Sequence, residues 1–165
     1  MKGRNYRAAV GMAYARREYI AGVPQPKIAK FTGGTAGNYS HKVMLVSDDG
    51  RAQVRHNALE AARVAANKIL QSIGEGSFFS LLKVYPHVVL RENKMIAAAG
   101  ADRLQEGMRR AFGKPVGLAA RVENGQTIME VHVNEQHISV AKEALRVASS
   151  KLPIKTKVVV EPSSG

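Results

Sequence analysis

Apolar and polar residues alternate along the chain in patterns that predict two amphipathic helices. In the first, small apolar residues recur at spacings of three and four, and Gly74 suits the end of the helix. Its expected buried face is formed by Ala58, Ala61, Ala62, Ala65 and Ile69. In the second, Asn134 is the expected N-cap and Pro153 stops the helix. Its apolar stripe consists of Val140, Ala141, Ala144, Leu145, Ala148 and Leu152.

The two helical segments also resemble each other. ALEAARVAANKI, from Ala58, and AKEALRVASSKL, from Ala141, agree at 7 of 12 positions and lie 83 residues apart. A duplicated strand-helix unit would explain this agreement. Convergence of two alanine-rich amphipathic helices explains it equally well, so both interpretations stay open.

Short apolar runs between turn signals predict the strands, at residues 42–47, 77–85, 87–91, 116–123, 126–133 and 157–160. The turn at residues 48–50 leads from the first of them into the first helix. Pro86 lacks the amide donor of a strand residue and separates the second from the third. Asn124 and Gly125 favour a two-residue type I′ turn, which predicts a β-hairpin between the fourth and fifth strands.

These elements predict an α+β fold, a two-layer sandwich in which two helices pack on one face of a mostly antiparallel sheet. The length of 165 residues and the hydrophobic content of 45% are typical of a single domain, residues 1–165, with its core at residues 42–160. Residues 1–41 lack sustained periodicity, so we expect an extended basic arm, called the arm below, whose order comes from a binding partner. Residues 92–114 are expected to form a projecting loop and residues 161–165 a tail.

The net charge of +12 is concentrated in two segments. Residues 1–30 contain seven Lys or Arg residues against one acid, and residues 83–121 contain eight against three, whereas the rest of the chain is nearly neutral. The natural complement of such a surface is a polyanion, either a nucleic acid or an anionic membrane. The longest apolar run has seven residues, far short of the roughly 20 that cross a bilayer, and Arg16 and Arg17 interrupt any signal-peptide pattern. We therefore expect a cytoplasmic protein with no membrane partner.

The sequence contains no pattern that indicates catalysis, a metal site or a cofactor. Cysteine is absent, which removes thiolate chemistry, and the histidines are not at metal-ligand spacing. We expect exposed or structurally hydrogen-bonded side chains for His41, His56, His87, His132 and His137. The glycines before Lys114 lack the spacing of a phosphate-binding loop, and residues 33–37 lack the dinucleotide-binding pattern. Asp102 and Glu106 are explained by ion pairs with nearby arginines.

The basic residues follow a pattern that indicates RNA binding, because clustered cations release phosphate counterions and the planar arginine side chain can donate two hydrogen bonds to one phosphate. Tyr6, Tyr14 and Tyr19 lie among the arm cations and can stack on unpaired bases. The cations of the arm are Lys2, Arg4, Arg7, Arg16, Arg17, Lys27 and Lys30. Those of the loop, set among glycines, are Arg91, Lys94, Arg103, Arg109, Arg110 and Lys114. A free regulatory RNA-binding protein and a small basic enzyme acting on RNA are alternatives, although no convergent acid-base pair is visible.

Three segments resemble one family, the universal large-subunit ribosomal proteins called L-sixteen in bacteria and L-ten-e in archaea and eukaryotes. They are REYIAGVPQPKI from Arg17, RHNALEAARVAANK from Arg55, and YPHVVLRENKMIAAAGADRLQEGMRRAFGKPVGLAARV from Tyr85. The resemblance is to the archaeal and eukaryotic branch. The chain ends at Gly165 without the long eukaryotic extension, which favours an archaeal-type protein, whereas residues 1–7 depart from the family pattern.

The resemblance implies a structural constituent of the large ribosomal subunit that takes part in translation and is not an enzyme. Its implied partners are the large-subunit rRNA at the base of the central protuberance, the vicinity of the 5S rRNA, tRNA near the peptidyl transferase centre, and neighbouring large-subunit proteins. The loop at residues 95–110 would then point toward bound tRNA. Arg103, Arg109 and Arg110 are expected to contact tRNA or nearby rRNA, with Lys114 in the same loop. Arg91 and Lys94 are expected to fix the base of the loop.

Overall fold

The computed structural model describes residues 2–95 and 107–163. Within these ranges the α-helices are α1 (His56–Leu70) and α3 (Ile138–Ser149). The strands are β1 (Thr32–Gly34), β2 (His41–Ser47), β3 (Ala52–Arg55), β4 (Phe78–Leu82), β5 (Val88–Glu92), β6 (Lys114–Val122), β7 (Thr127–Val133) and β8 (Thr156–Pro162). Short 3-10 helices are η1 (Gly3–Tyr6), η2 (Arg17–Tyr19), η3 (Gln71–Ile73), η4 (Glu75–Ser77), η5 (Gly107–Arg110) and η6 (Glu135–His137).

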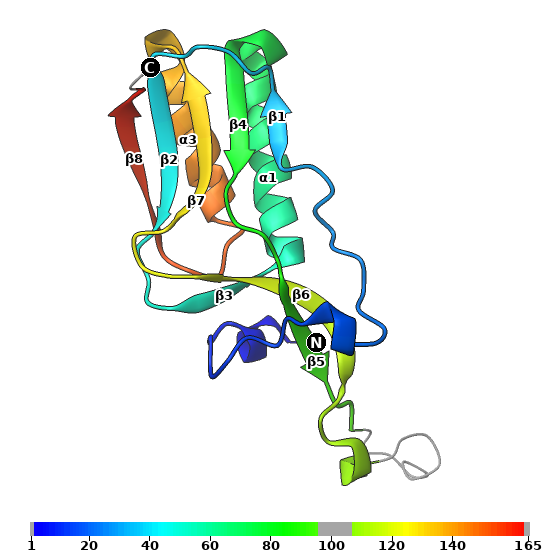
Figure 1. Cartoon of the computed structure of the whole chain (residues 1–165). Helices are drawn as coiled ribbons and strands as arrows, with labels where there is room; N and C mark the ends of the chain where they lie inside the picture. The colour runs from blue at the N-terminus through cyan, green and yellow to red at the C-terminus, as the bar shows by residue number, and fades with distance from the viewer. Residues whose placement is uncertain (1, 96–106, 164–165) are drawn as a thin grey trace.

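A five-stranded antiparallel sheet in the order β1-β4-β7-β2-β8 forms one layer, and both helices cover one of its faces (Figure 1). The main hydrophobic core lies between these layers and includes the fully buried side chains of Phe78, Leu45, Leu59 and Leu145. The predicted α+β sandwich, with two helices on a mostly antiparallel sheet, is confirmed.

The two strand-helix-strand units β2-α1-β4 and β7-α3-β8 occupy equivalent places in this sheet. Because β4 pairs with β7 and β8 pairs with β2, exchanging the two units reproduces the same strand order in reverse. The helices pack against each other and carry the same ion pair, Arg63 to Glu60 at 2.7 Å in α1 and Arg146 to Glu143 at 2.8 Å in α3. This arrangement favours duplication of one unit over convergence of two helices.

The predicted hairpin between the fourth and fifth strands is wrong. β6 and β7 follow each other, but β6 is the central strand of a separate three-stranded sheet, β3-β6-β5 (Figure 1). Ser47 of β2 bonds to the turn instead, because its carbonyl accepts the Gly125 N–H and its N–H donates to Gln126 O, both at 2.9 Å. Among the described residues only glycines have positive φ, so Asn124 does not adopt the conformation that a type I′ turn requires.

The buried face of α1 differs from the one predicted for the first helix, and Ala62 is the residue common to both. The buried side chains of α1 are His56, Leu59, Ala62, Ala66 and Leu70. Ala61 is exposed, and Ala58, Ala65 and Ile69 are only half-buried. The face is rotated because a leucine side chain buries more apolar area than an alanine, which turns Leu59 and Leu70 toward the core.

The second helix confirms its predicted stripe but not its predicted cap. All the expected stripe residues are buried except Val140, which is half-buried. Asn134 precedes η6 rather than α3, and its side chain makes no capping hydrogen bond. Its Oδ1 atom instead accepts the Ser40 N–H at 3.4 Å, which ties this turn to the start of β2.

Two strands are absent from the prediction. β1 lies inside the expected arm and pairs with β4, and β3 separates the turn at residues 48–50 from α1. β1 has three residues and β3 has four, too few to show a clear alternation. The predicted strands are confirmed, with those on either side of Pro86 placed in different sheets. β8 extends to Pro162, inside the expected tail.

Candidate nucleic-acid interface

The arm contacts both edge strands of the three-stranded sheet. At β3, the Gln53 N–H donates to the carbonyl of Arg7 at 2.7 Å. At β5, the Val89 N–H donates to the carbonyl of Tyr14 at 2.8 Å. Edge strands present unpaired main-chain groups, and the arm satisfies some of them at each edge.

Apolar contacts reinforce this docking. Ile20 is 7% exposed and forms a second, small hydrophobic cluster with Val89 and Leu118. Tyr14 and Val23, also from the arm, pack against this cluster. The arm was expected to gain its order from a binding partner, but these contacts show that part of its order comes from the chain itself.

Arg121 of β6 holds the arm by its main chain. Its guanidinium donates to the carbonyls of Gly11 at 2.7 Å, Val10 at 3.2 Å and Met12 at 3.3 Å. Its Nε also donates to Oε1 of Gln53 at 3.2 Å. Sequence reasoning missed this role, because Arg121 contributed only to a charge count; the available signal was a single arginine within the apolar run of β6.

Arg91 joins the arm to the base of the loop. Its Cζ lies 3.3 Å from the ring centroid of Phe112 and 4.7 Å from that of Tyr14, and its Nη1 donates to Phe112 O at 2.7 Å. The Tyr6 hydroxyl donates to Arg91 O at 3.1 Å. Burial, followed by the nearby Glu92 carboxylate, raises the pKa of Tyr6, which keeps this donor protonated.

Gly113 allows the two sides of the loop base to meet. It has a φ of 77°, and a Cβ atom at this position would lie 2.7 Å from the Glu92 carbonyl carbon and 2.8 Å from the Asn93 nitrogen. The β5–β6 pairing runs up to Glu92 opposite Lys114. Only glycine combines this conformation with so close a main-chain approach.

Most of the predicted RNA-binding cations are exposed at the arm and the loop base. Within the described ranges, no side-chain hydrogen bond or ion pair is seen for Lys2, Arg4, Arg16, Arg17, Lys27, Lys30, Lys94, Arg109 and Lys114. Arg7 instead pairs with Asp49 at 2.7 Å, and this hydrogen bond is the first cause of the lowered pKa of that carboxyl. Arg110 is exposed but has an interaction of its own, and Arg103 lies outside the described residues.

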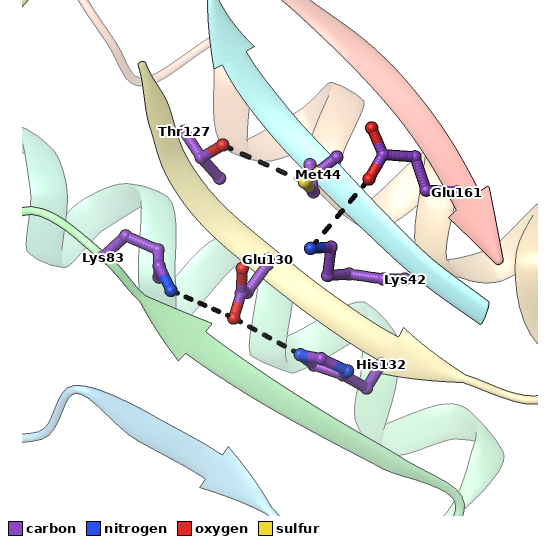
Figure 2. Close-up of polar contacts among 7 residues, drawn as sticks. All are labelled: Lys42, Met44, Lys83, Thr127, Glu130, His132 and Glu161. Atoms are coloured by element: carbon purple, nitrogen blue, oxygen red, sulfur yellow. Dashed lines mark hydrogen bonds and ion pairs between the residues drawn. The ribbon is translucent and has the colours of Figure 1, made fainter. Parts of the chain in front are cut away.

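Several cations of the five-stranded sheet and its helices are paired with carboxylates. Figure 2 shows Glu130 of β7 between Lys83 at 3.5 Å and His132 at 3.3 Å, and Lys42 facing Glu161 at 4.0 Å. Further ion pairs join Lys157 to Asp48, Arg63 to Glu60, and Arg146 to Glu143. Among the described residues, cations without an ion pair, such as Lys68, Lys142 and Lys151, also lie outside the arm, but the net positive charge is concentrated in residues 1–30 and 83–121.

The described residues contain no group of three or more potential metal ligands. His56 is buried, and its Nδ1 accepts the Lys27 N–H at 3.1 Å. Asp102 and Glu106, expected to form local ion pairs, lie outside the described residues. Neither helix in residues 2–95 and 107–163 is long and apolar enough to span a bilayer.

A comparison with protein families identifies the family to which the chain belongs. A family model described as ribosomal protein L16p/L10e matches residues 10–159. The chain belongs to this ribosomal protein family. The match includes the three-stranded sheet, the docked part of the arm from Val10, and both helices.

Curated relatives agree with the family assignment. A protein from Staphylothermus marinus, named large ribosomal subunit protein uL16, is 58% identical over 154 residues, which cover 92% of this chain and 88% of the relative. A protein of the same name from Hyperthermus butylicus is 56% identical, covering 96% and 89% of the two chains. One from Sulfolobus acidocaldarius is 54% identical, covering 96% and 92%.

Family membership confirms the resemblance inferred from the sequence, including its archaeal type. The chain is a structural constituent of the large ribosomal subunit and takes part in translation as a component of the ribosome. The family consists of structural ribosomal proteins rather than enzymes, in agreement with the prediction.

Proposed function

We propose that the protein binds large-subunit rRNA through a surface formed by the arm and the loop base, at the base of the central protuberance near the 5S rRNA. We further propose that the loop supports tRNA positioning near the peptidyl transferase centre, next to neighbouring large-subunit proteins. The observation that carries the proposal is the concentration of exposed cations at the arm and the loop base, where residues 1–30 contain seven Lys or Arg residues and one carboxylate, and where nine cations show no side-chain partner within the described residues.

The arm has the two chemical features that a folded RNA requires. Arg16 and Arg17 are exposed side by side next to Tyr19, whose side chain is 78% exposed. Exposed arginines neutralise phosphates and release their counterions, and a free tyrosine ring offers a stacking surface for an unpaired base. Because the arm is docked by main-chain hydrogen bonds, its cationic side chains stay available for RNA.

At the loop, Arg91 is engaged with Phe112 and Tyr14, so its expected role in fixing the loop base is performed through protein contacts. Arg109 and Lys114 are exposed and extend the positive surface toward the loop. The proposed contacts of Arg109 and Arg110 with tRNA or nearby rRNA follow from this position at the loop and from the resemblance, and that of Arg103 follows from the resemblance alone.

Replacing three arm cations tests the rRNA interface. We expect Arg16→Ala, Arg17→Ala and Lys27→Ala together to weaken rRNA binding and to reduce the slope of log K against log salt by up to about 0.7 to 0.9 per lost phosphate contact. The matched control removes three exposed lysines elsewhere, Lys142, Lys151 and Lys155, and therefore the same net charge. An unchanged slope in the arm variant, or an equal change in the control, would show that the arm does not contact phosphates.

A second variant distinguishes the proposed role of the loop from that of the arm. Arg109→Ala with Arg110→Ala is expected to leave folding and subunit incorporation near normal and to weaken tRNA-dependent steps. Incorporation is measured by co-sedimentation with the large subunit, and tRNA binding by filter assays on the purified subunits. Loss of incorporation would show instead that the loop anchors the protein during assembly.

A further inference from the structure

A hollow of about 470 Å³ lies where the arm meets the loop base. Tyr6 and Tyr14 from the arm, Arg91 from β5, and Phe112 from the loop contribute to its lining. Three of the nine Tyr and Phe residues of the chain thus converge on one small hollow. This concentration of rings is not explained by the main core, which lies between the helices and the five-stranded sheet.

Phe112 is held in place but left open to solvent. Arg91 covers one face of its ring, Tyr14 meets it edge to face with centroids 5.4 Å apart and planes at 85°, and Arg91 also donates to its carbonyl. The side chain is nevertheless 62% exposed, so the accessible area comes from the face opposite Arg91 and from the rim. A phenylalanine fixed in orientation and exposed on one face is a ready surface for a flat partner.

Exposed methionines and cations near Phe112 favour a partner that has both an apolar surface and a negative charge. Met95 and Met108, in the described parts of the same loop, are 60% and 67% exposed. Lys94, Arg109 and Lys114 are exposed in the same segment. An unpaired nucleotide satisfies both demands, because its base has an apolar face and its phosphate carries the negative charge.

We propose that the open face of Phe112, at the edge of the hollow between the arm and the loop base, stacks on an unpaired base of the large-subunit rRNA. This inference rests on the proposed rRNA-binding function and assigns one specific contact to it. Arg91, on the other face of the ring, continues the stack as a cation over the aromatic system. The stack therefore links a nucleotide to the loop through Phe112 and to the small sheet through Arg91.

Recognition at this site is expected to tolerate changes of base. The Tyr6 hydroxyl, the Asn93 side-chain amide and the Gln53 side-chain amide all line the hollow, but each already donates within the chain, to the carbonyls of Arg91, Gly107 and Tyr6. Few donors are left to distinguish one base edge from another. Stacking, which every base can provide, then supplies most of the affinity.

The first test is crosslinking in intact large subunits that contain the protein. Short-wave ultraviolet irradiation followed by mass spectrometry is expected to give adducts of Phe112 or Tyr14 with a base outside Watson–Crick pairs. Crosslinks from Tyr19 or Tyr85 with none from Phe112 and Tyr14, or protection of Phe112 by a neighbouring protein, would overturn the proposal.

The second test compares two substitutions in binding to archaeal large-subunit rRNA. Phe112→Leu keeps an apolar side chain but removes the ring, and is expected to weaken binding by roughly 5- to 150-fold, the range found for loss of one stacked base. Phe112→Tyr keeps the ring and should bind near the level of the unmodified protein. Circular dichroism checks that both variants fold.

The salt dependence distinguishes this contact from the phosphate contacts. Phe112→Leu should lower affinity without changing the salt slope, whereas the Arg16, Arg17 and Lys27 variant should change the slope. Normal affinity in Phe112→Leu with a reduced slope in the arm variant overturns the stacking contact and leaves the proposed function intact. If neither variant alters rRNA binding, the proposed function fails as well.

A matched RNA change completes the test. Once crosslinking identifies the nucleotide, an RNA fragment with an abasic site at that position is compared with the intact fragment. The Phe112→Leu variant should bind the two fragments with equal affinity. The unmodified protein should lose affinity for the abasic fragment. Equal losses in both proteins would show that the base and the ring act independently, which contradicts stacking.

Discussion

Two regions of the molecule are stabilised in different ways. The body, formed by the five-stranded sheet with α1 and α3, has a large apolar core and several ion pairs at its surface. The arm region, formed by the three-stranded sheet with the docked arm and the loop base, has a small apolar cluster of its own, Ile20, Val89 and Leu118, while Val54 and Val122 of its sheet join the main core. It is completed by main-chain hydrogen bonds and by two arginines, Arg91 and Arg121.

This difference shows how one small domain can be stable and still leave charge for a partner. Carboxylates in the body neutralise cations close to them, which reduces self-repulsion where the fold must be compact. In the arm region, Arg91 and Arg121 bind carbonyls and rings, while Arg16, Arg17 and Lys27 show no side-chain partner within the described residues. Stability is therefore expected to depend mostly on the body, and the proposed RNA affinity on the arm region.

The largest expected effect is in the core of the body. Phe78 is fully buried at the start of β4, and we expect Phe78→Ala to lower the free energy of unfolding by about 3 to 5 kcal/mol. Urea unfolding followed by circular dichroism measures the loss. The neighbouring Phe79, half-buried on the opposite face of the strand, is the control, and Phe79→Ala should cost clearly less. Equal losses at the two positions would contradict the assignment of the core to the helical face.

A smaller and more local effect is expected in the arm region. Ile20→Ala should remove about 2 kcal/mol, because it empties one place in the small cluster. Hydrogen exchange should accelerate at the amides of Gln53 and Val89, which donate to the arm, and stay unchanged at Lys83, which donates to Ile128 within the body. Val10→Ala, at a position 80% exposed, is the control and should leave all three amides unaffected.

Arg121 tests whether the arm is held by a charged side chain. Arg121→Gln should destabilise the docked arm by about 1.5 kcal/mol, the lower end for hydrogen bonds to a charged group. Limited proteolysis should then cut residues 8–16 faster while the body stays resistant. Arg121→Lys keeps the charge but loses the planar fork, so intermediate protection is expected. If residues 8–16 of Arg121→Gln stayed fully protected from the protease, Ile20 and the main-chain hydrogen bonds alone would be enough to dock the arm.

The smallest effect is a pH dependence at the junction of the two regions. Burial, followed by the positive charges of Arg55 and Lys27, lowers the pKa of His56 below its usual 6.5. The folded protein thus binds a proton at His56 less readily than the unfolded chain does. Its contribution to stability is complete above about pH 6.5 and decreases as the pH falls below this value.

His56→Gln should abolish this decrease while retaining an oxygen that can accept the Lys27 N–H. Unfolding measured at a series of pH values from about 7 to 5 compares the two proteins. The lowered pKa values of Asp49 and Glu143 act at lower pH, because their usual values are 3.8 and 4.5. An unchanged slope in the variant would assign the pH dependence to other groups.

The body was largely predictable from the sequence, whereas the arm region was not. Strands and helices of the body carry long periodic patterns, and the prediction failed there at the short strand β1, at the Asn134 cap and at the exact face of α1, since alanines mark a helix face less clearly than Leu59 and Leu70 do. The position of Asn124 and Gly125 suggested a local hairpin, but pairing of β7 with β2 and β4 took precedence. A local turn signal does not report such non-local competition.

The candidate site was predicted in composition but not in arrangement. The sequence identified the basic segments, and the family assignment agrees with a partner made of RNA. It did not reveal that Arg121 and Gln53 hold the arm or that Arg91 and Phe112 join it to the loop. These contacts link residues 21 to 111 positions apart, a separation at which periodicity carries no information.

The manner in which the arm is docked has a consequence for how its sequence can change over evolution. The groups of the arm that Arg121, the Gln53 side chain and the edge amides bind are carbonyl oxygens of Tyr6, Arg7, Val10, Gly11, Met12 and Tyr14. A carbonyl is present in every amino acid, so most substitutions at these positions preserve those bonds. The backbone path of the arm can therefore be conserved while its side chains are substituted. In each lineage, selection can then adapt those side chains to the proposed RNA partner.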